Sequence, residues 1–284
     1  MHRRPGAGTL ARVNPVLGAL RALSSLVTPP RDVDPPTFAG LPYRAPHVGS
    51  GRAPLGEVYL PDGAGPAPSV VWVHGGGFTV GSRAMKPMRL LATACRRAGW
   101  ASLTFDYRLV PRGGGARAAV EDTVAAWTWW QAQTERFNLD PDRIVLAGLS
   151  AGGCAALLAA PALDPAPTGV VSVFALYDFD SLTGATASLF ARVAAGSSPD
   201  ARRAASPLHT ALCAAPTLVL HGEADTLTPV DAATRYVARR VAAGLDTTTR
   251  LYPGAPHAFF NTPDRVPAPE ATRDLLAWLA ARGA

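Results

Sequence analysis

The sequence predicts an α/β fold, with a mostly parallel central sheet, helices on both faces and a small cap. Segments typical of strands and of helices alternate along most of the 284 residues, which is the rhythm of β-α-β units. Two apolar strands end in glycine-rich turns instead of polar ones. One irregular stretch interrupts the alternation late in the chain, as an insertion after a strand would.

The N-terminal region, residues 1–45, is expected to form an arm outside this alternation. Apolar residues recur at helical spacing from Leu10 to Val27, which indicates an amphipathic helix that lies on the domain. Arg21 interrupts the apolar run and no clear cleavage site follows, so we prefer this helix to a signal peptide. A proline-rich connector, TPPRDVDPPTFAGLPYRAP, leads into the main domain, residues 46–284.

The main domain begins with two strands and then alternates helix and strand. The expected elements before the interruption are Glu57–Leu60, Ser69–Val73, Met85–Ala98, Ala101–Phe105, Ala116–Gln133, Arg143–Ala147, Ala151–Ala160 and Val170–Phe174. Residues 177–212 are the irregular insertion. The alternation resumes with strands at Thr217–His221 and Thr247–Tyr252 and helices at Val230–Ala243 and Glu270–Ala281.

Composition argues against several classes of protein. The formal charge is +6, but the arginines are scattered and no basic run carries interleaved aromatic residues, so we expect no nucleic-acid partner. The three cysteines are widely spaced, without a CxxC pair, which argues against a disulfide framework and against zinc. No segment approaches the roughly 20 apolar residues of a membrane span. We therefore expect a cytoplasmic protein without a metal ion.

The stretch RIVLAGLSAGG carries the candidate nucleophile, Ser150. It has the pattern G-x-S-x-G between an apolar strand and an alanine-rich helix. Glycines allow a sharp turn there, which leaves the serine hydroxyl exposed at its tip, close to the start of the helix.

A serine hydroxyl needs a neighbouring base, held in one tautomer by a carboxylate. His257 follows the last predicted strand, and Asp225 follows the strand before it. Ser150, Asp225 and His257 therefore occur in the chain order of an α/β-hydrolase triad. Asp178 and Asp180, after the strand that follows the nucleophile, are the weaker alternatives for the acid.

The stretch VVWVHGGGFTVGS predicts an oxyanion hole. A run of glycines lets the main chain approach a substrate closely, and its N–H groups can stabilise the oxyanion that acyl transfer builds. We expect Gly75, Gly76 and Ala151 to supply these N–H groups, and His74 to anchor the loop by hydrogen bonds. A phosphate-binding loop is the rival interpretation, but the run lacks the GK[ST] ending and the GxGxxG spacing.

Seven motifs together resemble the hormone-sensitive-lipase-like branch of the α/β-hydrolase superfamily. They are HGGGF at residues 74–78, DYRLVP at 106–111, AAVEDTVAAWTW at 118–129, SAGG at 150–153, ASPL at 205–208, HGEADTLTP at 221–229 and PHAFF at 256–260. The resemblance implies an α/β-hydrolase fold and a carboxylesterase that acts on short- or medium-chain acyl esters without a cofactor. It also implies a cap built from the N-terminal arm and the insertion at 177–212.

We therefore expect a serine carboxylesterase with a small-molecule acyl ester as substrate, in a monomer or homodimer. Phe38, Leu189 and Phe190 are candidates to line the acyl pocket, although each also fits the core of a cap. Two alternatives keep the triad: an arylformamidase-like amidase and an acyl transferase. A third is a non-catalytic ligand-binding receptor on the same fold, which would be expected to have lost Ser150 or His257.

Overall fold

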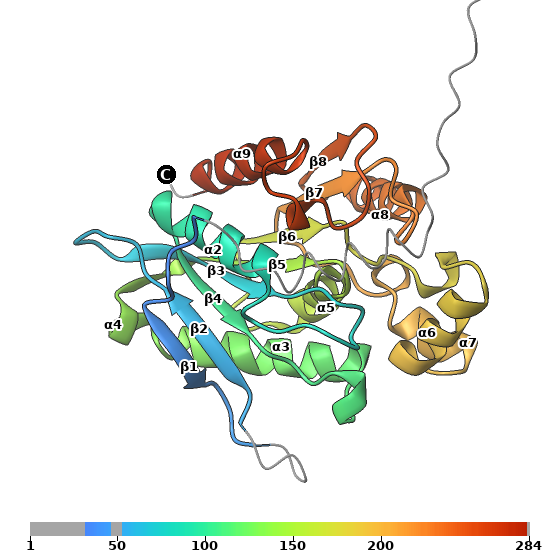
Figure 1. Ribbon diagram of the computed structural model, residues 1–284, viewed down its shortest axis with the longest axis horizontal. Coiled ribbons are helices and arrows are strands. Elements are labelled where there is room, and N and C mark those ends of the chain that lie inside the picture. Colours follow the sequence, from blue (N-terminus) through green and yellow to red (C-terminus); the bar gives the residue numbers. More distant parts are fainter. Residues whose placement is uncertain (1–31, 47–52, 283–284) are drawn as a thin grey trace, which may run out of the picture.

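The computed structural model describes residues 32–46 and 53–282, which contain one eight-stranded sheet (Figure 1). The strand order is β1-β2-β4-β3-β5-β6-β7-β8. The strands are β1 (Phe38–Pro42), β2 (Leu55–Tyr59), β3 (Ala67–Val73), β4 (Ala101–Phe105), β5 (Leu139–Leu149), β6 (Gly169–Val173), β7 (Thr217–Gly222) and β8 (Thr247–Tyr252). β2 is antiparallel to β1 and β4, and the remaining pairs are parallel. The predicted fold class is confirmed.

Helices cover both faces of the sheet, as Figure 1 shows. They are α2 (Lys86–Arg97), α3 (Ala116–Gln131), α4 (Thr134–Phe137), α5 (Ala151–Ala159), α8 (Val230–Ala242) and α9 (Ala268–Ala280). None of the helices in the described part of the chain is long and apolar enough to cross a membrane. Each long helix lies within a few residues of its predicted bounds.

Two apolar cores lie on opposite faces of the sheet. Successive side chains of a strand point to opposite faces, so β3 sends Val70 and Trp72 to the core under α2 and α9. Val71 and Val73 point into the core under α3, α5 and α8. These two layers bury the central strands on both sides and fix the carboxyl ends of the parallel strands along one edge.

β1 corrects the predicted arm. Residues Phe38–Pro42 lie within the segment expected to form an arm, but they pair with β2 at the edge of the sheet. The proline-rich sequence around this strand predicted a connector. An edge strand tolerates proline because one of its sides needs no ladder hydrogen bonds. Residues 1–31, which carry the expected amphipathic helix, lie outside the described residues.

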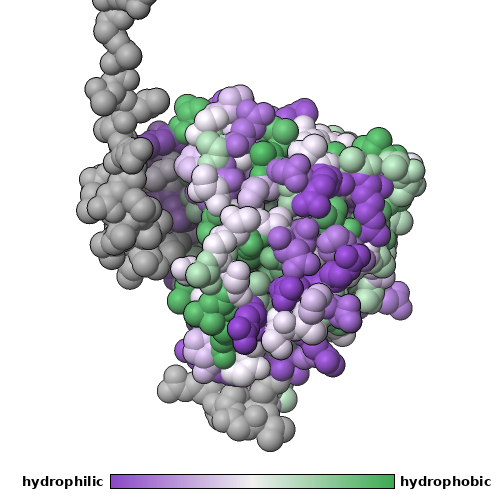
Figure 2. Space-filling model, turned by 90° about the vertical axis from the view of Figure 1, so that its right-hand side faces the viewer, coloured by the Kyte–Doolittle hydropathy of each residue, from purple (hydrophilic) through white to green (hydrophobic). Residues whose placement is uncertain are grey.

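The insertion at 177–212 contains two helices, α6 (Ala185–Ala195) and α7 (Pro199–Ala204). They project beyond the sheet at the right of Figure 1. Short 3-10 turns, η3 (Phe179–Ser181) and η4 (Pro207–His209), lie on either side of them. Figure 2 shows this side of the molecule, where apolar side chains are interspersed with hydrophilic ones.

Candidate active site

Ser150 lies on the sharp turn between β5 and α5, in a backbone conformation that side chains rarely adopt. Its φ is 53° and its ψ is −120°. Its N–H donates a hydrogen bond to the Val173 carbonyl at 2.9 Å, and its carbonyl accepts from Cys154 and Leu176. The turn is so tight that a Cβ at Gly152 would lie 2.2 Å from the Val73 carbonyl oxygen. The glycine therefore lets the start of α5 pack against the end of β3.

The structure brings the three predicted side chains into one line of hydrogen bonds. The Ser150 hydroxyl lies 2.9 Å from Nε2 of His257, and Nδ1 of His257 lies 2.7 Å from Oδ2 of Asp225. Asp225 follows β7 and His257 follows β8. All three residues lie beyond the carboxyl ends of parallel strands, which is the edge where ligands bind in open α/β sheets.

The Asp225 carboxylate is held by several donors. Its Oδ1 accepts from the N–H groups of Leu227 and Thr228, both at 2.9 Å, and its Oδ2 accepts from the Thr228 hydroxyl at 2.9 Å. Burial would raise the pKa of Asp225, but the hydrogen bond and charge of His257 and the Thr228 N–H hold that pKa below its ordinary value. Asp225 is therefore an ionised partner for the histidine.

Asp178 and Asp180, the alternative acids, have other partners. Asp178 lies 3.4 Å from His209 and from Arg235, and its side chain accepts from the N–H of Asp180. Asp180 forms an ion pair with Arg202 at 2.7 Å. Neither carboxylate has a hydrogen bond to His257.

The loop after β3 lies against the serine. A Cβ at Gly75 would lie 3.3 Å from the Cβ of Ser150. Gly76 has a φ of 111°, which favours glycine, and it starts a turn in which its carbonyl accepts from the N–H groups of Thr79 and Val80. Within the described residues, the N–H groups of Gly75, Gly76 and Ala151 have no hydrogen-bond partner. The loop and the start of α5 therefore leave these three N–H groups unused by the described part of the chain.

The family model for the alpha/beta hydrolase fold matches residues 70–261. The chain belongs to the alpha/beta hydrolase family. This match confirms the superfamily that the motifs resemble, and relatives that are named esterases agree with the branch. Esterase LipC of Mycobacterium tuberculosis is 32% identical over 217 residues, 68% of this chain and 53% of that protein. The probable carboxylic ester hydrolase LipM of the same organism is 30% identical over 256 residues, 83% of this chain and 57% of that protein.

Solved structures share the alpha/beta hydrolase fold at low sequence identity. An acetyl ester-xyloside bifunctional hydrolase from Caldicellulosiruptor lactoaceticus has a TM-score of 0.76 at 17% identity, and the match covers 88% of this chain and 98% of that one. Esterase Est2 from Thermogutta terrifontis, with propionate bound, has a TM-score of 0.71 at 21% identity, with 87% and 94% covered. The chain spans about half the length of the curated relatives that match most of it.

His74 anchors the glycine loop of this alpha/beta hydrolase. Its buried ring stacks on Tyr107 with 4.1 Å between ring centroids, and its Nδ1–H donates to the Gly75 carbonyl at 2.7 Å. The Tyr107 hydroxyl donates to the His74 carbonyl at 3.1 Å. Burial lowers the pKa of His74 to about 4, so the ring is neutral near pH 7.

An aromatic row connects the glycine loop to α6. The ring of Phe78 lies 6.3 Å from that of Phe179, which lies 6.1 Å from that of Phe190 on α6. Phe190 also reaches the loop itself, because a Cβ at Gly77 would lie 3.1 Å from its ring. Of the three pocket candidates, Phe190 is therefore beside the site. Phe38, by contrast, packs on Phe137 at the β1 edge of the sheet.

Thr228 is the site residue that the sequence interpretation missed. Its hydroxyl lies between the two members of the acid and base pair, 2.9 Å from Oδ2 of Asp225 and 3.1 Å from Nδ1 of His257. The available signal was its place three residues after Asp225, in the turn before α8, where a hydroxyl readily bonds a neighbouring side chain.

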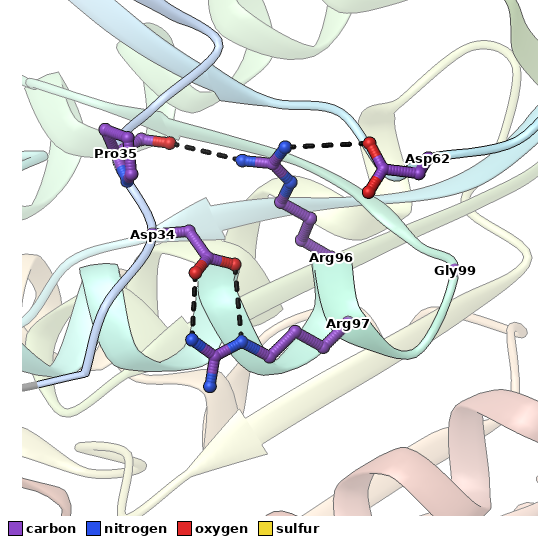
Figure 3. Close-up of a pocket in the computed structure, with 6 residues that line it drawn as sticks. All are labelled: Asp34, Pro35, Asp62, Arg96, Arg97 and Gly99. Carbon is purple, nitrogen blue, oxygen red and sulfur yellow. Dashed lines mark hydrogen bonds and ion pairs between the residues drawn. The ribbon is translucent and has the colours of Figure 1, made fainter.

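A surface hollow near the amino ends of the parallel strands does not belong to this site (Figure 3). It lies where α2 ends and β4 begins, and its charged side chains are already paired. Arg97 bonds Asp34 at 2.8 Å, while Arg96 bonds the Pro35 carbonyl and lies 3.8 Å from Asp62. The described residues also contain no group of three or more His, Cys, Asp or Glu side chains that could hold a metal ion.

Proposed function

We propose that this chain is a serine carboxylesterase that hydrolyses short- to medium-chain acyl esters. One observation carries the proposal: the continuous line of hydrogen bonds from Ser150 through His257 to Asp225. A buried carboxylate that accepts from Nδ1–H leaves Nε2 free to take the serine proton. The unpartnered N–H groups beside Ser150 support acyl transfer in particular, because that reaction creates an oxyanion.

The reaction has two steps. In the first, Ser150 attacks the ester carbonyl carbon while His257 takes the hydroxyl proton, and Asp225 stabilises the imidazolium. The N–H groups of Gly75, Gly76 and Ala151 hold the tetrahedral oxyanion. The alcohol then leaves with the proton from His257, and an acyl-enzyme remains on Ser150.

In the second step, water attacks the acyl-enzyme with His257 again as the base. The acid is released and the Ser150 hydroxyl is restored. Each oxyanion donor is worth about 3 kcal/mol of transition-state stabilisation. No hydrogen bond within the described residues has to break before these N–H groups can donate to an oxyanion, which supports the proposal.

The surroundings of Ser150 support an apolar acyl group as substrate. Phe190 of α6 packs on the glycine loop that lies against Ser150. The names of curated relatives include esterase and carboxylic ester hydrolase. The Thermogutta esterase holds propionate or butyrate in its solved structures, which supports short acyl chains. A monomer or homodimer, a cytoplasmic location and the absence of a nucleic-acid partner stay predictions of the sequence.

Hydrolysis of a p-nitrophenyl ester series, from acetate to laurate, tests the proposal. We expect steady turnover that favours the shorter esters and is abolished in Ser150→Ala. Matching anilides and an added alcohol acceptor complete the panel. Faster cleavage of the anilides would favour the amidase, and a faster transfer to the alcohol than to water would favour the transferase. Equal, negligible rates in wild type and Ser150→Ala would contradict catalysis by this serine.

A further inference from the structure

The Thr228 hydroxyl occupies the junction between the proposed acid and base. It lies 2.9 Å from Oδ2 of Asp225, 3.1 Å from Nδ1 of His257 and 3.3 Å from the Phe174 carbonyl. Thr228 is 6% exposed, and its N–H donates to the other oxygen of Asp225. One residue therefore contacts both carboxylate oxygens and the imidazole.

The positions of the protons follow from these distances. A hydroxyl has one proton and can also accept. The Thr228 O–H donates to Oδ2 of Asp225, because the carboxylate is charged and is closer than the Phe174 carbonyl. Nδ1–H of His257 points mainly at Asp225, 2.7 Å away, and secondarily at the Thr228 oxygen. The hydroxyl thus limits rotation of the imidazole about its bond to Cβ.

We propose that Thr228 is a positioning residue of the esterase, whose hydroxyl both orients His257 and moderates the basicity of Asp225. This inference rests on the proposed function. Thr228 touches neither the substrate nor the reacting atoms, and it acts through the two side chains it bonds. A hydroxyl that donates to a carboxylate spreads its negative charge, so the carboxylate stabilises the neighbouring imidazolium less. Loss of this hydroxyl is therefore expected to strengthen the pairing between Asp225 and His257.

The other titratable groups around this junction are few. His221 of β7 lies 3.4 Å from Oδ2 of Asp225, and its Nε2–H donates to the Thr228 carbonyl at 2.8 Å. Burial lowers the pKa of His221, which keeps that ring neutral. Tyr177 lies beyond it, with 6.0 Å between the two ring centroids, and burial raises the pKa of its hydroxyl. Neither group brings a charge to the junction near pH 7.

Thr228→Val removes the hydroxyl and keeps the shape of the side chain. Oδ2 of Asp225 loses one donor and pairs more strongly with the protonated imidazole of His257. The hydrogen bond from Nδ1–H to Thr228 is also lost, which weakens the support of the imidazole. That bond is the longer and secondary one, so the stronger pairing with Asp225 dominates. We expect the acidic limb of the kcat/KM profile to move to higher pH and kcat to fall about tenfold, with KM nearly unchanged.

The experiment compares pH profiles of p-nitrophenyl acetate hydrolysis for wild type, Thr228→Val and Thr228→Ser. Serine keeps the hydroxyl, so it should restore both kcat and the acidic limb. Thr234→Val is the matched control, because the Thr234 hydroxyl bonds only the Val230 carbonyl within α8. Circular dichroism checks the fold of each variant. If the valine variant does not fold, Thr228→Ala, which also lacks the hydroxyl, takes its place.

Each outcome separates this inference from the proposed function. An active wild type with the same profile and kcat in Thr228→Val overturns the positioning role alone. Loss of activity with an unmoved acidic limb, or equal loss in Thr228→Ser, shows a merely structural role and also overturns it. A wild type that neither turns over nor is labelled by a fluorophosphonate at Ser150 overturns the proposed function, and this inference with it.

Discussion

Ser150 holds a strained backbone that its neighbours support. The combination of φ 53° and ψ −120° costs a residue with a side chain about 1–3 kcal/mol. The three backbone hydrogen bonds to Val173, Cys154 and Leu176 keep the turn in place. The same turn directs the Ser150 hydroxyl toward His257, so the strained backbone conformation is also the one that brings the two side chains together.

Replacing Ser150 by glycine should therefore stabilise the fold relative to alanine. Glycine tolerates a positive φ, and the relief outweighs the extra flexibility that glycine gives the unfolded chain, for a net gain of about 1 kcal/mol in the free energy of unfolding. Urea denaturation of Ser150→Gly and Ser150→Ala measures it. Ser188, exposed within α6, is the control, and there glycine should be less stable than alanine by about 1 kcal/mol. If the glycine variant were less stable than the alanine variant at position 150 as well as at position 188, that result would argue against strain at Ser150.

His74 makes the stability of the fold depend on pH. Its pKa is about 4 in the folded chain and near 6.5 when unperturbed, so the unfolded chain binds more protons between these values. Stability is therefore complete above about pH 6.5 and falls by about 3 kcal/mol as the pH drops to about 4. We measure the free energy of unfolding by urea denaturation at several pH values in that range. It should change less with pH in His74→Gln than in wild type. An identical pH dependence in the two proteins would mean that His74 is not held neutral.

Helix α6 places one side chain on the glycine loop and leaves its neighbour exposed. Phe190 contacts Gly77 and Phe179, whereas Leu189 is 61% exposed. We expect Phe190→Ala to open the space beside the loop and to raise kcat/KM for p-nitrophenyl octanoate severalfold relative to the acetate. Leu189→Ala should leave this ratio unchanged. An unchanged ratio in Phe190→Ala, or an equal change in both variants, would show that Phe190 does not line the acyl pocket.

The elements that the sequence predicted well are those with strong local signals. β3 contains an apolar run at residues 70–73, β4 alternates apolar and polar residues, and α8 and α9 each have one apolar face, so these patterns located them. β1 was missed because it lies in a proline-rich segment that predicted a connector, and only pairing with β2 makes it a strand. α6 was missed because only two of its residues, both alanines, are buried, so it has no strong apolar face to reveal it. These two elements depend on tertiary contacts that local patterns do not encode.

The candidate site was predictable where a motif defines a role. Ser150 and the glycine loop have distinctive turns, and the order of the strands indicated Asp225 and His257. Thr228 has no motif of its own, and only the folded turn brings its hydroxyl to both partners. The sequence likewise did not distinguish Phe38 from Phe190. Only the folded structure shows that Phe38 lies on the edge strand β1 and Phe190 on α6.

The described part of the chain brings the candidate site together at the carboxyl ends of the parallel strands. The two cores hold β5, β6, β7 and β8 in one parallel array, so turns far apart in the sequence meet at Ser150. The paired arginines of the hollow in Figure 3 lie near the amino ends of the parallel strands, away from this chemistry. The central claim is thus that the line from Ser150 to Asp225 forms and hydrolyses an acyl-enzyme.

Rapid mixing of the protein with excess p-nitrophenyl acetate, followed by mass spectrometry of the quenched sample, tests that claim most directly. We expect p-nitrophenol release to show a burst of about one equivalent per chain, with the acetyl group on Ser150. Ser150→Ala should show neither the burst nor the acetyl group. Turnover without an acyl group on Ser150, or an equal burst in Ser150→Ala, would contradict the account.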